Sequence, residues 1–107
     1  MIIEYIGRPA MLEQTAEECA ELAHACLKLA RILRGENPTP ADFETVTNNL
    51  TEEWTDLTIC ATELKLMADE DIIKRKLGRF NKRLEEFGYK EAGNEAWDAK
   101  REGELKD

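Results

Sequence analysis

Acidic residues at helical spacing, in two separate places, are the first feature of the sequence that could support chemistry. The string EECAEL contains Glu18 and Glu21, and the string EEWTDL contains Glu53 and Asp56. Side chains three residues apart lie on one face of a helix, close enough to share a ligand. Acidic residues make up 23 of the 107, so a solvated helix surface gives the same spacing. The surroundings of the two pairs must therefore decide between these interpretations.

Apolar residues surround both pairs when the chain is placed on a helical wheel. At about 100° per residue, one apolar set falls within about 40° of Glu18, and a second set surrounds Glu53. The first set is Met11, Leu22, Ala25, Leu29 and Ile32, and the second is Val46, Leu57, Cys60, Leu64 and Met67. Carboxylates on such a core-facing stripe are costly unless a cation or a metal ion neutralises them.

Two long amphipathic helices are predicted to position the carboxylates. The first is expected over residues 10–34 and stops at Gly35, because glycine readily adopts the left-handed conformation that ends helices. The second is expected to begin at capping signals in the segment 39–42, where Thr39 is the expected N-cap, and to extend to Met67. No segment shows the alternation of a strand, so the pattern predicts an all-α protein.

The chain reversal between these helices is predicted to bring the two acidic pairs together. The midpoint of Glu18 and Asp56 is residue 37, and the midpoint of Glu21 and Glu53 is the same residue. An antiparallel hairpin that turns there places Glu18 level with Asp56, and Glu21 level with Glu53. Four carboxylates on one patch repel one another. A hard divalent cation, Mg²⁺ or Mn²⁺, relieves that repulsion by taking oxygen ligands.

A third helix and the chain ends complete the expected fold. Asp69 caps a helix that runs to about Phe87 and stops at Gly88. The first seven residues are apolar enough to pack onto the helices or onto a partner subunit. The polar tail contains one large apolar anchor, Trp97, and two alternatives stay open for it: a short helix over 95–101, or fraying.

The expected architecture is one all-α domain spanning residues 1–107, with a core over about 10–87 and a polar extension over 88–107. It is a helical bundle built on a long antiparallel helical hairpin plus the third helix. Three helices leave apolar surface uncovered, so we expect assembly into homodimers or homotetramers.

Composition excludes several functional classes. The net charge of −8 argues against binding a nucleic acid polymer, which needs a basic face. No apolar run approaches the roughly 20 residues of a membrane span, and the first residues do not resemble a signal peptide. Cys19, Cys26 and Cys60 show no CxxC spacing, so we interpret them as small buried hydrophobic residues in a reducing cytoplasm.

The two acidic strings resemble the E-x-x-E and E-x-x-D motifs of the MazG-like nucleoside triphosphate pyrophosphohydrolases. The resemblance covers roughly residues 11–87 and includes Leu22 and Leu57, which follow the two strings. It implies an all-α enzyme whose four carboxylates bind Mg²⁺ and which hydrolyses an NTP or dNTP to the monophosphate and pyrophosphate. The spacer between the two motifs is longer than usual in that family. Symmetric lengthening of both helices would preserve the site.

Further roles follow from the same resemblance. Basic residues and an asparagine on the third helix are implied to bind phosphates, and the candidates are Lys76, Arg79, Asn81 and Arg83. Metal ions would activate water and neutralise the phosphates, with Glu53 or Glu21 as general base. The basic residues have an alternative interpretation as a solvated face paired with nearby acids.

Three other residues have weaker assignments. Gln14 lies one turn before Glu18 and is a candidate for contacting the base of a nucleotide. Trp54 is a second candidate for stacking on a base, although interhelical packing is its simpler role. His24 is the only histidine, and a di-iron bundle needs a second E-x-x-H string, so we expect a partly exposed helix residue.

Two other functional classes remain open at this point. The first is a non-catalytic helical oligomer that binds a nucleotide or a metal ion and sequesters it. The second is a structural oligomer whose acidic residues only solvate a surface. Metal dependence separates the second from the others, and turnover separates an enzyme from a binding protein.

Overall fold

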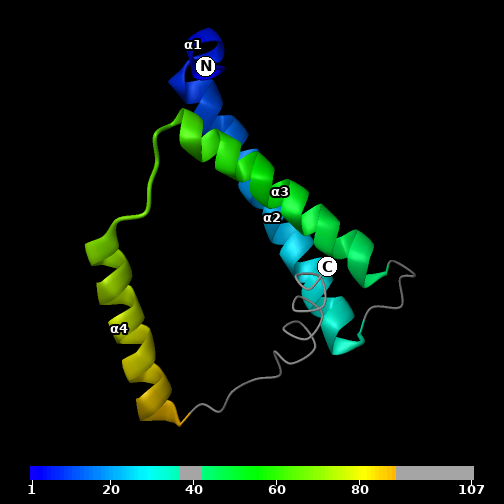
Figure 1. The fold of residues 1–107 in the computed structure, drawn as a ribbon, viewed down its shortest axis with the longest axis vertical. Helices are drawn as coiled ribbons and strands as arrows, with labels where there is room; N and C mark the ends of the chain where they lie inside the picture. Colours follow the sequence, from blue (N-terminus) through cyan, green and yellow to red (C-terminus); the bar gives the residue numbers. More distant parts are fainter. Residues whose placement is uncertain (37–41, 89–107) are drawn as a thin grey trace, which may run out of the picture. The chain divides into compact units, whose positions relative to one another are not determined.

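The computed structural model describes residues 1–36 and 42–88. These residues form four helices and no strand, so the all-α prediction is confirmed for the described part of the chain (Figure 1). The helices are α1 (Ile3–Ile6), α2 (Arg8–Arg34), α3 (Phe43–Glu63) and α4 (Glu70–Phe87). The chain divides into two compact units, residues 1–67 and 68–107.

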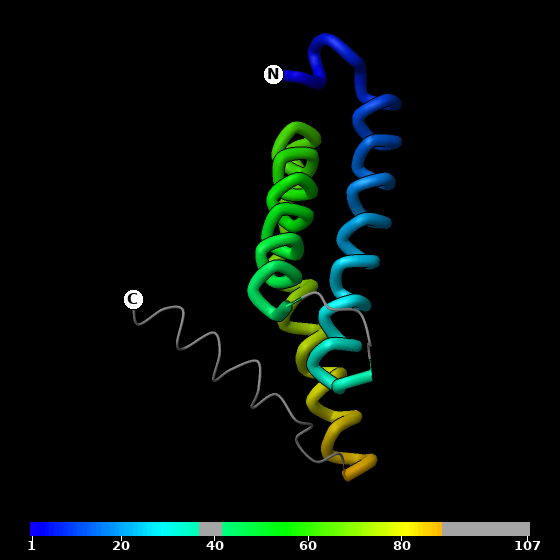
Figure 2. Tube along the Cα trace, turned by 90° about the vertical axis from the view of Figure 1, so that its right-hand side faces the viewer, coloured from blue at the N-terminus to red at the C-terminus, as the bar shows by residue number. Residues whose placement is uncertain are grey.

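Helices α2 and α3 lie side by side and run in opposite directions (Figures 1 and 2). The residues buried between them belong to the two predicted apolar stripes: Met11, Ala25 and Leu29 from the first, and Val46, Cys60 and Leu64 from the second. The helical period predicted these buried residues correctly, because an amphipathic helix buries its one apolar stripe. Met67 was wrongly included, since it lies beyond α3 and is exposed.

Helix α2 begins slightly earlier than predicted and ends where predicted. Gly7, with φ of 86°, separates it from α1, and Pro9 lies in its first turn, where proline is tolerated. At the other end Gly35 has a left-handed φ of 72°, and its backbone N–H donates to the carbonyl oxygens of Arg31 and Ile32.

The start of α3 is capped by one of the predicted signals. The Asp42 carboxylate accepts a hydrogen bond of 2.7 Å from the backbone N–H of Thr45. Asp42 is therefore the N-cap itself, where the sequence favoured Thr39. Thr39 and the proline that follows it lie outside the described residues.

The end of α3 differs from its predicted position at Met67. The helix stops at Glu63, because Lys65 adopts a left-handed φ of 56°. The backbone N–H of Leu66 then donates to the carbonyl of Ala61 at 2.9 Å, which is the six-to-one bond of a Schellman ending. Glycine usually supplies this conformation, so a lysine there gave no signal in the sequence.

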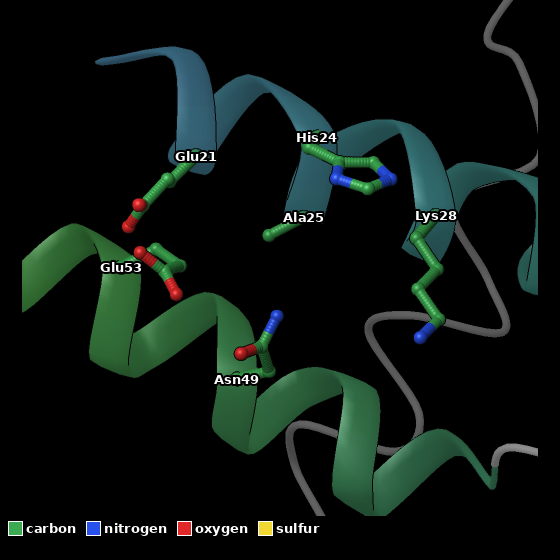
Figure 3. Close-up of a pocket in the computed structure, with 6 residues that line it drawn as sticks. All are labelled: Glu21, His24, Ala25, Lys28, Asn49 and Glu53. Atoms are coloured by element: carbon green, nitrogen blue, oxygen red, sulfur yellow. The ribbon is translucent and has the colours of Figure 1, made fainter. Parts of the chain in front are cut away.

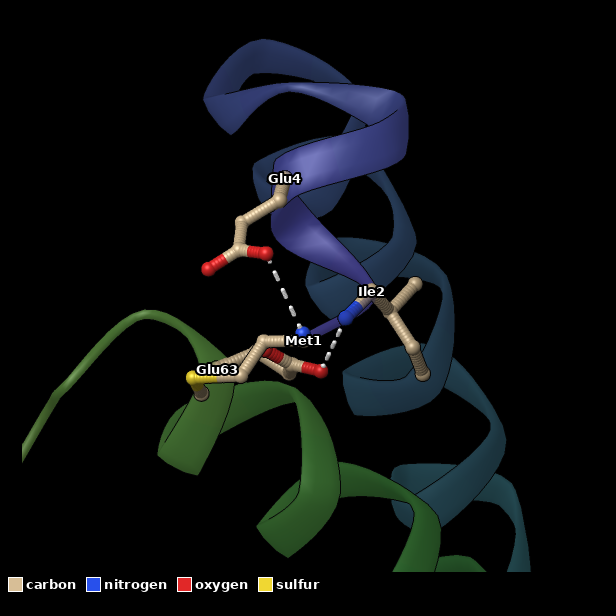
Figure 4. A network of polar contacts seen from close by, with 4 residues as sticks. All are labelled: Met1, Ile2, Glu4 and Glu63. Carbon is tan, nitrogen blue, oxygen red and sulfur yellow. Dashed lines mark hydrogen bonds and ion pairs between the residues drawn. The ribbon is translucent and has the colours of Figure 1, made fainter.

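Of the apolar residues at the start of the chain, which were predicted to pack, Ile3 reaches the core, whereas Ile2, Tyr5 and Ile6 are exposed. Ile3 contacts the core cluster formed by Met11, Cys60 and Leu64. The backbone N–H of Ile2 donates to Glu63 Oε1 at 2.7 Å, and the Met1 amino group lies 3.4 Å from a Glu4 carboxylate oxygen (Figure 4). A buried acid of α3 therefore receives a hydrogen bond from the backbone at the start of the chain.

Helix α4 has the predicted boundaries. Asp69 accepts from the backbone N–H of Ile72 at 3.0 Å, and Gly88 ends the helix with φ of 59°. Its large apolar residues recur at alternating spacings of four and three, and all are at least partly exposed: Ile73, Leu77, Phe80, Leu84 and Phe87. The tail, with Trp97 and the expected short helix over 95–101, lies outside the described residues.

The cysteine prediction holds for one residue of three. Cys60 is buried in the core, whereas Cys19 and Cys26 are exposed. Seven residues separate Cys19 from Cys26, so they share a face of α2, and that face is not the one packed against α3. No helix in the described part of the chain is long and apolar enough to cross a membrane.

Candidate metal centre

Three carboxylates meet between α2 and α3. One oxygen from each of Glu18, Glu53 and Asp56 lies within 4.8 Å of the others. Glu18 and Glu53 are partly buried, whereas Asp56 is exposed. Oxygen ligands on opposite sides of a Mg²⁺ or Ca²⁺ ion lie roughly 4–5 Å apart, given metal–oxygen distances of about 2.0–2.6 Å. The cluster therefore has the dimensions of a divalent-cation site.

The fourth predicted carboxylate, Glu21, lies beside this cluster. Its side chain points toward that of Glu53 across the interface between the two helices (Figure 3). The two carboxyl groups are close enough to share a hydrogen bond. All four residues that the sequence singled out thus lie together, and Glu53 is the one that faces the other three.

Repulsion and burial act together on Glu53. Its pKa is raised above the ordinary glutamate value, first by desolvation, then by the hydrogen bond with Glu21 and by the negative charges of Glu21, Asp56 and Glu18. Among the described residues, the buried Oε2 atoms of Glu18 and Glu53 have no hydrogen-bond partner. A cation between these carboxylates would supply the charge that the protein itself does not.

Gln14 contacts the cluster. Its amide Nε2 donates to Glu18 Oε1 at 2.9 Å, so Gln14 orients one of the candidate ligands. The sequence assigned it to the base of a nucleotide, and that role stays a prediction. Trp54 is 59% exposed, so the interhelical packing role is wrong for the described chain, and its ring is accessible for stacking.

The residues predicted to bind phosphate lie on α4, in the unit 68–107. Lys76, Arg79 and Arg83 line a recess on this helix together with Phe80, and Asn81 does not contribute to it. The only ion pair of α4 within the described ranges joins Lys82 to Glu86 at 4.0 Å. The predicted phosphate-binding role of these residues therefore stays a prediction.

A second feature of the α2–α3 interface was not found from the sequence. A recess of about 150 Å³ adjoins the carboxylates and is lined by Glu21, His24, Ala25, Lys28, Asn49 and Glu53 (Figure 3). The midpoint of Ala25 and Asn49 is residue 37, as for the acidic pairs. The arithmetic that aligned the carboxylates could therefore have placed Asn49 in the site.

Comparisons with known proteins give no family assignment. The chain has no significant match among protein-family models, curated proteins or solved structures. The functional interpretation therefore rests on the geometry of the carboxylates and on the resemblance of their two motifs.

Proposed function

We propose that this protein is a Mg²⁺-dependent nucleotide pyrophosphohydrolase that converts an NTP or dNTP to the monophosphate and pyrophosphate. The observation that carries the proposal is the meeting of Glu18, Glu53 and Asp56 within 4.8 Å, with buried carboxylate oxygens that lack a partner among the described residues. The motif resemblance supplies the reaction. A hard cation is the ligand these oxygens favour, and Mn²⁺ is the alternative ion.

The proposed chemistry assigns each carboxylate a task. Glu18, Glu53 and Asp56 would hold Mg²⁺, with Glu21 beside them. When bound, Mg²⁺ supplies an acidified water and neutralises the negative phosphates. Glu53, or alternatively Glu21, would accept the proton of the water that attacks the α-phosphorus. The bond from the α-phosphorus to the bridging oxygen breaks, and pyrophosphate leaves with the electron pair.

The size of the recess bears on where the nucleoside binds. Small-molecule sites typically enclose about 300–1,000 Å³, and the recess beside the carboxylates encloses about 150 Å³. It has room for phosphate groups and not for a whole nucleotide. We propose that Trp54 and Gln14 contact the base, and the phosphate-binding role of the basic residues of α4 stays a separate prediction.

We also propose that a second copy of the chain completes the bundle, as a homodimer or homotetramer in the cytoplasm. The exposed apolar side chains on unit 1–67 and on α4 support this: Leu12, Leu27, Trp54, Ile59, Leu77 and Phe80. Light scattering on the purified protein at several concentrations tests it, and a monomer at all concentrations would contradict it.

The test of the enzyme is direct. Purified protein is incubated with MgCl₂ and a panel of NTPs and dNTPs, and the products are separated by chromatography. We expect monophosphate and pyrophosphate, absent when EDTA replaces MgCl₂, and strongly reduced for Asp56→Asn. The same panel ranks the bases and sugars.

No product from folded, Mg²⁺-loaded protein would overturn the enzymatic proposal. The alternative is then a helical oligomer that binds the nucleotide or the metal ion and sequesters it. A thermal-shift screen with the same nucleotides, with and without MgCl₂, detects that function, because a ligand that binds only the folded state raises the melting temperature.

A further inference from the structure

The recess between α2 and α3 has two chemically different ends. Glu21 and Glu53 lie at one end, and their carboxylates face each other (Figure 3). His24 and Lys28 from α2, and Asn49 from α3, line the other end. Both helices belong to unit 1–67, so these residues share one packed interface.

Lys28 is the most informative of these residues. It is partly buried, yet it makes no hydrogen bond or ion pair with any residue in 1–36 or 42–88. Acidic residues outnumber basic ones by 23 to 15, so a carboxylate partner would be easy to provide. Lys28 therefore presents to the recess a positive charge that no described carboxylate pairs with, and an anion from outside the chain is a matching partner for it.

The neighbours of Lys28 offer matching groups. Neither His24 nor Asn49 makes a side-chain hydrogen bond with the residues that the structure describes. The Asn49 amide reaches into the recess from α3, opposite Ala25, whose small side chain leaves room there (Figure 3). An ammonium, an imidazole and an amide together form a set of donors suited to the oxygens of an anion.

We propose that His24, Lys28 and Asn49 bind the phosphate chain of the nucleotide. A polyphosphate has oxygens for both ends of the recess: some approach a cation held by the carboxylates, and others accept hydrogen bonds from the donors. The assignment rests on the proposed function for the identity of the nucleotide. It places metal ligands and phosphate contacts on the same helix pair, independently of α4.

The single histidine makes the test specific. In Mg²⁺-saturated protein without a histidine tag, inorganic pyrophosphate is titrated while the His24 imidazole signals are followed by NMR at constant pH. We expect a saturable shift, and we expect sodium sulfate at matched ionic strength to cause none. An equal shift with sulfate, or no shift with pyrophosphate, would overturn the assignment.

Variants of Lys28 test whether this residue contributes to the affinity for pyrophosphate. Lys28→Gln should weaken pyrophosphate binding about tenfold, which corresponds to losing one charge-assisted hydrogen bond. Lys28→Arg should retain most of the affinity, and Lys65→Gln, which changes a lysine outside the recess, should retain all of it. If Lys28→Gln binds pyrophosphate like the unmodified protein while Lys76→Gln does not, the phosphate site lies on α4 and the assignment is wrong.

This outcome is distinguishable from failure of the enzymatic proposal. If nucleotides are hydrolysed but His24 does not respond to pyrophosphate, the function stands and the phosphate assignment is overturned. If pyrophosphate shifts the His24 NMR signals and no nucleotide is hydrolysed, the phosphate assignment is kept and the enzymatic proposal is overturned. In active protein, Lys28→Gln should raise KM about tenfold with little change in kcat, because phosphate binding acts in the ground state and the transition state alike.

Discussion

Two glutamates of α3, ten residues apart, are withdrawn from water in different ways. Glu63 is only 8% exposed, and its Oε1 accepts a short hydrogen bond from the Ile2 backbone. Glu53 is partly buried and faces the carboxylates of Glu18, Glu21 and Asp56. Each has an Oε2 atom without a partner among the described residues, and Glu53 also has the negative charges of Glu18, Glu21 and Asp56 beside it.

The difference separates a structural acid from a candidate functional one. Glu63 receives a hydrogen bond from the backbone of its own chain, and this bond contributes to the fold. A carboxylate that faces other carboxylates lowers the stability of the fold until a cation arrives. Predictions that treat the two glutamates separately therefore test the assignment of function.

The largest expected effect is on turnover. Glu53→Gln keeps the shape of the side chain but removes a metal ligand and candidate base, so kcat should fall by about 10²–10⁴. The matched control is Glu52→Gln, one residue away on the exposed side of α3. Steady-state kinetics with the preferred nucleotide measure both. Equal kcat values for Glu53→Gln and Glu52→Gln would show that Glu53 is not a catalytic residue.

The second effect is on stability, and its sign depends on the metal. Because the pKa of Glu53 is raised, the metal-free protein should lose stability as pH rises from the ordinary glutamate pKa through the raised one. Glu53→Gln should abolish that loss and melt at a higher temperature than the unmodified protein at pH 7 in EDTA. MgCl₂ should reverse the order, since only the unmodified protein gains from binding. Melting temperatures that do not change when MgCl₂ is added would indicate that the carboxylates of the cluster are only solvated and bind no metal ion.

The third prediction concerns Glu63. Glu63→Ala leaves the Ile2 N–H without its acceptor, so the free energy of unfolding should fall by about 1–3 kcal/mol. Glu63→Gln retains a carbonyl acceptor and should lose less. Urea unfolding measures both variants, and neither should change the midpoint of Mg²⁺ activation. A change in that midpoint would show that the two regions are coupled.

The smallest effect is at the start of α3. The hydrogen bond from Thr45 lowers the pKa of Asp42, so its capping contribution is present above the unfolded carboxyl pKa and is lost as pH falls through the lowered folded value. Asp42→Asn caps without a charge and should narrow the stability difference between pH 6 and pH 3. Denaturation at both pH values, with Asp42→Ala as the uncapped reference, checks this. Identical pH dependence of all three proteins would rule out the cap.

Local signals explain what the sequence could predict of the fold. Gly35, Asp69 and Gly88 act within one helical turn, so the ends that they define were correct. The end of α3 depends on the left-handed backbone conformation of Lys65, and the sequence has no glycine there that would have predicted it. Cys19 and Cys26 were interpreted as buried from their residue type, but they lie on a face of α2 that is not packed against α3, and both are exposed.

Part of the site could also be predicted from the sequence, because the register of two antiparallel helices follows from where the chain turns. Mirror positions about residue 37 aligned Glu21 with Glu53, since antiparallel helices keep a constant register. Lys28 and Asn49 were missed because a polar residue acquires a role only from what lies across the interface. Trp54 was assigned to interhelical packing because its ring is apolar, yet the residue is 59% exposed.

The antiparallel register of α2 and α3 also places the four carboxylates on two separate stretches of the chain. The carboxylates of each helix are positioned by packing between the helices, so their arrangement is set by the α2–α3 interface. Covalent connection of two such helices sets the effective concentration of one for the other, in the millimolar range for short linkers. Chains cut between residues 36 and 42 should therefore rebuild the carboxylate cluster when the two fragments are mixed at comparable concentration.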